Sequence, residues 1–294
     1  MKRRYLGLFT ALFGLAAASI EASELASPEP SGSGAAVFKL SAVGATGKIK
    51  GGSAVLIAPG KLLTTCHVTR DAASIQVHRG GARLKAKPDV VDIEHDLCIL
   101  SAPDLLQSVP VELAMQGDLE VGDEVVAVGY PRGGSLALSK GRLKALHRYG
   151  AVRVLQVSAP FDYGQSGGAL LDERGRLVGI LAFKTLSGGD FHFALAFDRI
   201  NEEVFARQPT VPDGAIPMRA FWERARHAQP LFLRAASYEA DRDWHALLGV
   251  AQEWTASDAM NSASWFALWR ALFSLKRERD AELALVRAMA LIQR

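Results

Sequence analysis

From about residue 35 to residue 197, short apolar runs alternate with turn-forming glycine, proline and aspartate. The runs have the length of strands, as in Ser53–Ala58, Lys61–Thr65, Ser74–His78, Asp96–Ser101, Glu124–Gly129, Val152–Val157, Leu177–Phe183 and Phe191–Phe197. Many such runs separated by turn signals are typical of a β-sandwich or barrel. Too few helix-length segments lie between them for repeated βαβ units. This part of the chain is therefore predicted to be all-β.

The pattern changes near Asp198, where an N-cap aspartate followed by acidic residues predicts the start of a helix. Residues 208–217 contain three prolines and a glycine, and we interpret them as a linker. From residue 218 to residue 294, apolar positions recur at helical spacing. Because few contacts cross a typical linker, we expect this helical domain to be separable from the rest of the chain.

The helical domain contains a repeat. One copy comprises Trp265, Leu268, Trp269, Leu272, Ala281, Leu285 and Ala288, a spacing similar to the tetratricopeptide pattern. A shift of 34 residues towards the N-terminus again meets mostly apolar positions, with Arg234 as the exception. The sequence therefore predicts a small all-α domain of two degenerate tetratricopeptide-like repeats, with a generic pair of helical hairpins as the alternative.

The N-terminus has the features of an export signal. Three basic residues precede the apolar run Leu6–Ala18, which is shorter than the ~20 residues that span a bilayer. Small residues follow, with candidate cleavage sites after Ala18 and after Ala22. We therefore predict a signal peptide over residues 1–22 and a periplasmic or secreted protein. An uncleaved N-terminal anchor is the alternative.

Composition and charge narrow the possible partners. Residues 23–34 are rich in serine, proline and glycine and are interpreted as a flexible leader. Apolar residues make up 49% and charged residues 22% of the chain, as in ordinary globular proteins. The formal net charge of +3 disappears with the three basic residues of the signal. A neutral mature chain gives no electrostatic reason to expect nucleic acid, and no other segment is predicted to span a membrane.

Three local motifs carry candidate chemistry. His67 follows an apolar strand in the segment Thr64–Val68, and Asp96 stands at the head of another strand. Ser166 lies in the glycine-flanked turn Gly164–Leu170. Acyl transfer by serine needs a general base, a group that fixes the tautomer of that base, and donors for the oxyanion. The order His, Asp, Ser is that of the chymotrypsin-type arrangement.

The same serine turn also fits the G-x-S-x-G motif of α/β-hydrolases, but its context does not. That motif requires a helix after the serine, with the acid and the base later in the chain. Here a turn over residues 172–175 follows, flanked by short apolar runs. We therefore favour the chymotrypsin-type interpretation.

The motifs together support a family resemblance. The segments Gly52–Val55, Leu63–Val68, Asp96–Leu100, Val128–Pro131, Gly164–Leu170 and Phe193–Ala196 occur in the expected order. On these residues, the span from about Phe38 to Arg207 resembles a trypsin-like serine protease of the high-temperature-requirement type. We assign residues 35–207 to this domain.

The resemblance implies two six-stranded antiparallel β-barrels with the active site between them. It implies His67 as general base, Asp96 as the carboxylate that orients it, and Ser166 as nucleophile. The backbone N–H groups of Gly164 and Ser166 would form the oxyanion hole. The chain departs from the family at Gln165, where Asn or Asp is usual, and in carrying helices where a PDZ-like module would follow.

Two assignments stay open at the level of sequence. Asp89 and Asp92 are nearby substitutes for Asp96, which is preferred because the apolar strand begins directly after it. The base of the primary specificity pocket falls at Pro160, which favours a small or medium apolar side chain. Asp162 pointing inward would instead favour basic residues, and His192 would favour acidic ones.

Cys66 and Cys98 are the only cysteines. Two buried free thiols are one possibility. Export to an oxidising compartment favours a disulfide, and the resemblance puts both residues in the first barrel behind the catalytic residues. We therefore expect Cys66 and Cys98 to pair.

The leading hypothesis is an exported serine endopeptidase that acts on polypeptide substrates, with a helical tail that binds a partner or substrate. The main alternative is a catalytically silent protease fold that serves as a protein-binding scaffold. An esterase is a third reading, because the same triad cleaves esters. The remaining histidines lack metal-binding spacing and no C-x-x-C motif occurs, so we expect neither a metal nor another cofactor.

Overall fold

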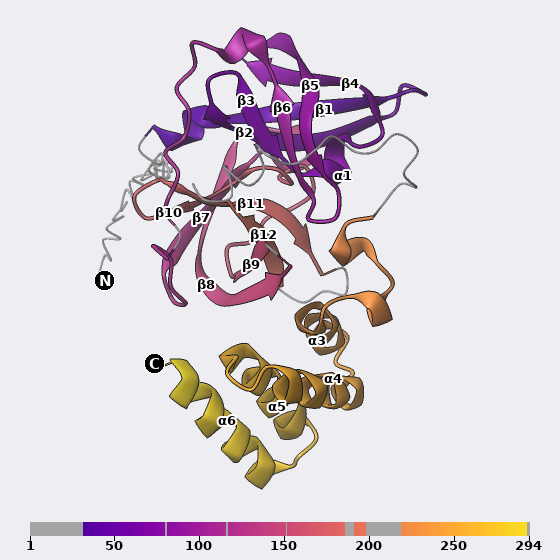
Figure 1. Ribbon diagram of the computed structural model, residues 1–294, viewed down its shortest axis with the longest axis vertical. Coiled ribbons are helices and arrows are strands. Elements are labelled where there is room, and N and C mark those ends of the chain that lie inside the picture. The colour runs from indigo at the N-terminus through magenta and orange to yellow at the C-terminus, as the bar shows by residue number, and fades with distance from the viewer. Residues whose placement is uncertain are drawn as a thin grey trace, which may run out of the picture.

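The computed structural model describes residues 32–79, 81–115, 117–150, 152–185, 191–197 and 219–292. The predicted signal peptide, most of the leader, the helix expected from Asp198 and the linker 208–217 lie outside these residues. Two β-barrels lie one above the other, and four helices follow at the far side of the second barrel (Figure 1).

The first barrel closes around a leucine-rich core. Its strands are β1 (Val37–Gly44), β2 (Ile49–Ala58), β3 (Lys61–Thr64), β4 (Ala72–Arg79), β5 (Ala82–Asp92) and β6 (Leu97–Ser101). They pair antiparallel in the order β1-β2-β3-β6-β5-β4, and β3 is followed by the short helix α1 (Cys66–Thr69). Fully buried leucines from several strands fill the interior.

The second barrel has the same strand arrangement. Its strands are β7 (Glu124–Gly129), β8 (Ala137–Tyr149), β9 (Val152–Val157), β10 (Ala169–Asp172), β11 (Leu177–Lys184) and β12 (His192–Ala196). They close antiparallel in the order β10-β11-β12-β9-β8-β7. The expected all-β architecture of two closed six-stranded barrels is confirmed.

Two strands without a clear apolar run in the sequence, β5 and β8, have an exposed face. β5 carries several charged residues and Pro88, and the strand register shifts between Pro88 and Val90. A proline is tolerated at such an irregularity because no ladder hydrogen bond needs its missing N–H. β8 alternates basic residues with buried Leu143, Ala145 and His147. Alternation of this kind leaves half the strand polar, and the strand is then hard to recognise by hydrophobicity.

Four helices form the C-terminal part: α3 (Leu231–Ala240), α4 (Trp244–Ser257), α5 (Ser262–Ser274) and α6 (Glu278–Ile292). Side-chain oxygens cap two of them, with Asp243 accepting from the N–H of Ala246 and Asn261 accepting from that of Ala263. Ala281 and Ala284 of α6 are buried in one cluster with Leu272 of α5. The expected C-terminal helices are therefore present, and their arrangement as tetratricopeptide-like repeats stays a prediction.

The helices share an apolar core with the second barrel. Phe232 of α3 stacks on His147 of β8, with ring centroids 4.4 Å apart and planes 4° apart. Phe193 of β12 and Trp254 of α4 pack around the same rings. We expected few contacts between the barrels and the helical tail, but these aromatic side chains pack across that boundary. A helical period shows only that a helix has an apolar face, and does not say which surface covers it.

Among the residues that the structure describes, no helix is long and apolar enough to cross a membrane.

His147 makes the stability of this interface depend on pH. Burial lowers the pKa of His147 from its ordinary 6.5 to about 4, although a hydrogen bond with Gln156 opposes the shift. As the pH falls, His147 therefore binds a proton at a higher pH in the unfolded chain than in the folded protein. The contribution of His147 to the free energy of unfolding is fully present above about pH 6.5. It decreases by about 3 kcal/mol as the pH drops towards 4.

We expect His147→Phe, which retains a ring on Phe232, to flatten the dependence of the unfolding free energy on pH between 6.5 and 4. Urea unfolding at several pH values measures this. The exposed His245 of α4 provides a control, because His245→Gln should leave the slope unchanged. A slope unchanged in His147→Phe would contradict the prediction.

Candidate active site

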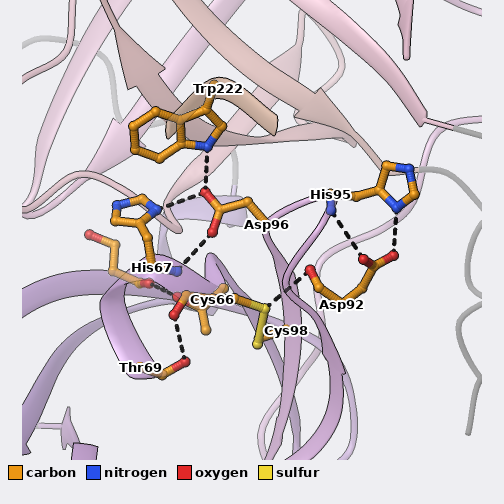
Figure 2. Close-up of a disulfide and its surroundings, with 10 residues drawn as sticks. Cys66, His67, Thr69, Asp92, His95, Asp96, Cys98 and Trp222 are labelled. Carbon is orange, nitrogen blue, oxygen red and sulfur yellow. Dashed lines mark hydrogen bonds and ion pairs between the residues drawn. A yellow bond between two sulfur atoms is a disulfide. The ribbon is translucent and has the colours of Figure 1, made fainter. Parts of the chain in front are cut away.

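His67 and Asp96 are held together by main-chain and side-chain hydrogen bonds (Figure 2). The Nδ1 atom of His67 lies 2.7 Å from Oδ2 of Asp96, and the His67 main-chain N–H donates to Oδ1, also at 2.7 Å. The Cys66 N–H donates to the Asp96 carbonyl at 3.3 Å. Asp96 has a φ of 60°, a left-handed conformation that Asp adopts more readily than most residues.

This arrangement fixes the tautomer of His67. A carboxylate only accepts hydrogen bonds, so Nδ1 must carry the proton that lies between His67 and Asp96. The lone pair of the neutral ring is then on Nε2. The His67 side chain is 19% exposed whereas that of Asp96 is 1% exposed, so the ring remains accessible while the carboxylate is buried. A histidine held in this way has one nitrogen available as a base.

The alternative aspartates have other partners. Asp92 bonds to Nδ1 of the neighbouring His95 at 2.7 Å, and Asp89 at the barrel surface bonds to Lys61 at 2.7 Å. Of the three candidates, Asp96 is therefore the one that the structure brings to His67.

The turn that carries Ser166 leaves two N–H groups without a protein acceptor. The N–H groups of Gln165, Gly167 and Gly168 donate to the carbonyls of Asp162, Leu181 and Gln165, respectively. Among the described residues, those of Gly164 and Ser166 have no hydrogen-bond acceptor. Gly164 has a φ of 90°, and a Cβ there would lie 2.6 Å from the Tyr130 carbonyl, so only glycine fits.

Ser166 and His67 come from different barrels and meet near Gly52. A Cβ on Gly52 would lie 2.7 Å from Val68, the residue after His67, and 3.4 Å from the Ser166 carbonyl. The Ser166 hydroxyl donates to the Ala182 carbonyl at 3.2 Å. Within the described residues, no hydrogen bond joins it to His67. Catalytic hydrogen bonds are often long without substrate and shorten in the complex, so this geometry does not argue against a Ser–His pair.

Asp162 is paired with cations rather than left unpaired beside the serine. Lys184 donates to Oδ1 at 2.8 Å and Arg132 donates to Oδ2 at 2.9 Å. Hydrogen bonds from Lys184, the Tyr163 main chain and Arg132 hold the pKa of Asp162 well below its ordinary value. Its negative charge is thus already balanced, which weakens its capacity to select a basic substrate side chain.

The other two predicted pocket residues lie in different surroundings. Pro160 is exposed, and its carbonyl accepts a hydrogen bond from Ser139. His192 is buried at the start of β12 and makes an edge contact with the ring of Phe161, with centroids 4.9 Å apart. The Gln165 side chain accepts from the Asp162 N–H at 2.9 Å, so the residue that departs from the family pattern closes the serine turn on itself.

Cys66 and Cys98 form a disulfide directly behind the His67–Asp96 pair, with Cα atoms 5.0 Å apart (Figure 2). The two chain segments are neighbours, because Thr64 of β3, two residues before Cys66, pairs with Cys98 of β6. Asp96 precedes β6 and His67 follows β3. The bond therefore joins the two chain segments that carry the base and its carboxylate.

A further contact to Asp96 was absent from the sequence analysis. The indole N–H of Trp222 donates to Oδ2 of Asp96 at 3.0 Å. Trp222 lies 126 residues after Asp96, in the part of the chain assigned to the helical domain. No local pattern marks such a contact, because it arises only when the tail folds back onto the barrels.

In the described part of the chain, no group of three or more His, Cys, Asp or Glu side chains is arranged to hold a metal ion.

The closed barrels, with a His–Asp pair and a glycine-flanked serine where they meet, define a chymotrypsin-like architecture. Residues 52–180 match the family described as trypsin-like peptidase domain. The chain is 33% identical over 146 residues to the periplasmic pH-dependent serine endoprotease DegQ of Escherichia coli, covering 47% of this chain and 32% of that protein. It is 31% identical over 151 residues to a probable periplasmic DegP-like serine endoprotease of Buchnera aphidicola, covering 48% and 32%.

Solved structures agree with this class. An HtrA-type protease, AlgW with a tripeptide, has a TM-score of 0.52 at 31% identity, over 59% of this chain and 60% of that one. The Rv3671c protease of Mycobacterium tuberculosis, in its active form, has a TM-score of 0.55 at 22% identity and covers 62% and 86%. The chain spans about a third of the length of the two curated relatives. The comparisons support a serine endopeptidase of the HtrA type for the barrel region.

The disulfide yields a stability prediction. A bond between cysteines 32 residues apart restricts the unfolded chain, which in the chain-entropy model stabilises the fold by about 3 to 4 kcal/mol. We expect the denatured, unreduced protein to show no free thiol by titration, and reduction to lower its melting temperature. Two free thiols per chain would contradict this prediction.

Proposed function

We propose that this chain is an exported serine endopeptidase that cleaves polypeptides through Ser166, His67 and Asp96. The observation that carries the proposal is the combination of two features on segments that approach each other at Gly52. His67 presents an unprotonated Nε2 because Asp96 holds its Nδ1 proton. The serine turn presents two N–H groups, of Gly164 and Ser166, that have no acceptor among the described residues.

These features fit the two charges that develop during acyl transfer. Nε2 of His67 would take the proton of the Ser166 hydroxyl as its oxygen attacks the substrate carbonyl, forming a tetrahedral oxyanion. The N–H groups of Gly164 and Ser166 would donate to that oxyanion. As it collapses, His67 would return the proton to the leaving amine, and water would then hydrolyse the acyl-enzyme by the same route.

Export is part of the proposal. The basic and apolar start of the chain is typical of a secretory signal, and a Cys66–Cys98 disulfide suits an oxidising compartment. The relatives described as periplasmic are consistent with a periplasmic or secreted location.

The helical tail would bind a partner or a substrate segment, with the two helix pairs as tetratricopeptide-like repeats. Its last helix, α6, exposes several large apolar side chains, namely Leu283, Val286, Met289 and Ile292. In a repeat array, a face of this kind is covered by a neighbouring repeat. This face is the part of the tail best suited to a protein contact.

Replacing the nucleophile tests the activity. We expect Ser166→Ala to fold normally and to lose peptide hydrolysis by about 10⁴- to 10⁶-fold, because only binding and oxyanion effects remain. Asp96→Asn should also slow hydrolysis strongly by favouring the wrong tautomer of His67. Cleavage of a fluorogenic peptide library measures both, and Ser257→Ala in α4 is a matched control for a lost hydroxyl.

A fluorophosphonate probe separates the proposal from its alternatives. Such a probe phosphonylates an activated serine with loss of fluoride, so it should label the full-length protein and not Ser166→Ala. An unlabelled and inactive wild-type protein would favour the catalytically silent scaffold. Labelling with turnover of esters but not of peptides would favour the esterase.

Side-chain specificity follows from the charges beside the serine. Since Lys184 and Arg132 balance Asp162, we expect cleavage after small or medium apolar residues rather than after Arg or Lys. Sequencing the products of a peptide library measures the preference. A profile dominated by Arg and Lys would contradict this expectation, and one dominated by Glu would assign the pocket to His192.

A further inference from the structure

The segment 219–229 between the barrels and α3, here called the strap, reaches the His67–Asp96 pair. Its short 3₁₀ helix, Phe221–Glu223, carries Trp222. The indole N–H donates to Oδ2 of Asp96 at 3.0 Å, the oxygen that also bonds to His67. Figure 2 shows the indole nitrogen and the imidazole meeting this oxygen. A residue of the C-terminal part of the chain thus completes the hydrogen bonding of the expected catalytic carboxylate.

The indole ring is fixed in place by aromatic contacts. It stacks on Phe183 of β11, with centroids 4.9 Å apart and planes 15° apart. Its other contact is an edge arrangement with the His67 ring at 5.2 Å. Phe183 comes directly after Ala182, whose carbonyl accepts from the Ser166 hydroxyl. Trp222 therefore contacts His67, Asp96 and the strand residue next to the one that accepts the Ser166 hydrogen bond.

Two ion pairs hold the strap directly after Trp222, and an aromatic contact holds it directly before. Glu223 pairs with Arg70, three residues after His67, with one N–O distance of 2.8 Å. Arg224 pairs with Glu94, two residues before Asp96, at 2.6 and 2.7 Å. Phe221 is fully buried and stacks on Tyr149 at 4.3 Å. These contacts anchor the strap to the chain segments next to the base and its carboxylate.

The carboxylate needs these donors because it is buried. With its side chain 1% exposed, Asp96 receives little help from water, and a buried charge is tolerated only where hydrogen bonds replace its hydration. Hydrogen bonds to charged groups are also stronger and more directional than neutral ones. Losing the indole donor would leave Oδ2 with His67 Nδ1 alone and remove one of the hydrogen bonds that orient the carboxylate.

We propose that Trp222 is a positioning residue for the reaction, which orients Asp96 and through it His67, so that the strap is part of the protease rather than of the tail. This proposal rests on the proposed function. Trp222 touches neither Ser166 nor the expected oxyanion donors in any recorded contact, so its effect falls on the orientation of the base. It links the tail to catalysis, because α3 begins two residues after the strap ends.

The test compares two Trp→Phe substitutions in the full-length protein. Trp222→Phe retains a ring over Phe183 and removes the donor. Trp265→Phe is the matched control, because the indole N–H of Trp265 donates to the Ala259 carbonyl within the tail at 2.9 Å. We expect Trp222→Phe to lower kcat about 10- to 100-fold with KM within about twofold, the range for a hydrogen bond to a charged group. The control should change neither constant.

A proton signature separates positioning from a loss of stability. The Nδ1 proton between His67 and Asp96 should give a far-downfield NMR resonance, and Trp222→Phe should shift it while Trp265→Phe should not. Unchanged kcat, raised kcat or an unmoved resonance in Trp222→Phe would overturn the proposal. Should this variant fail to fold, Arg224→Ala loosens the strap from the surface, and an unmoved resonance there would also overturn it.

The two proposals fail in different ways. A wild-type protein that neither cleaves peptides nor reacts with a fluorophosphonate would refute the proposed function. The resonance comparison does not depend on turnover, so it would still decide whether Trp222 controls the Asp96–His67 bond. An active wild-type enzyme with an equally active Trp222→Phe variant would refute only the role of Trp222.

Discussion

The buried carboxylate of Asp96 is the constraint on which the arrangement of this protein depends. An ionised group this far from water must be surrounded by donors, and the donors come from separate parts of the chain. The helix α1 supplies the main chain and ring of His67, and the strap supplies Trp222. Trp222 in turn rests on Phe183 of the second barrel. Satisfying one carboxylate thus requires both barrels and the C-terminal segment to be correctly packed.

A continuous apolar core connects these parts as well. Rings of Phe193, Phe232 and Trp254 surround His147, so the second barrel and the helices α3 and α4 share one interior. Interiors packed in this way transmit displacement, because close-packed side chains cannot shift independently. A displacement of the tail helices, such as one caused by a bound partner, would therefore also displace α3 and the adjacent strap. Within the strap, Trp222 bonds to Asp96, the expected catalytic carboxylate, so packing connects the tail with the proposed active site.

The features that could be predicted from the sequence are those that leave a local pattern in it. Turn signals between apolar runs predicted the barrels, and the order of His67, Asp96 and Ser166 predicted an active site built from both. The structure joins His67 to Asp96, whereas the Ser166 hydroxyl bonds to Ala182, so the complete site stays a prediction. The helical period predicted α3 to α6, but it could not show which surface they cover. Trp222 and the cations around Asp162 escaped prediction for a similar reason. Their partners, Asp96 and Asp162, lie far away in sequence. No local sequence pattern predicts that a single tryptophan or lysine will bond to a distant carboxylate.

At Asp96 a hydrogen-bond acceptor is surrounded by donors, whereas in the serine turn hydrogen-bond donors lack acceptors. There the main-chain carbonyls of Gly164, Gln165 and Ser166 each accept a hydrogen bond, whereas the N–H groups of Gly164 and Ser166 have no acceptor among the described residues. An N–H without a partner costs free energy when water is excluded, and the left-handed conformation of Gly164 restricts that position to glycine. These two N–H groups lie on a turn that approaches the segment of His67 at Gly52. Such donors are what an oxyanion requires, and Nε2 of His67 can accept the departing proton, so this complementarity is the physical basis for the proposed hydrolysis.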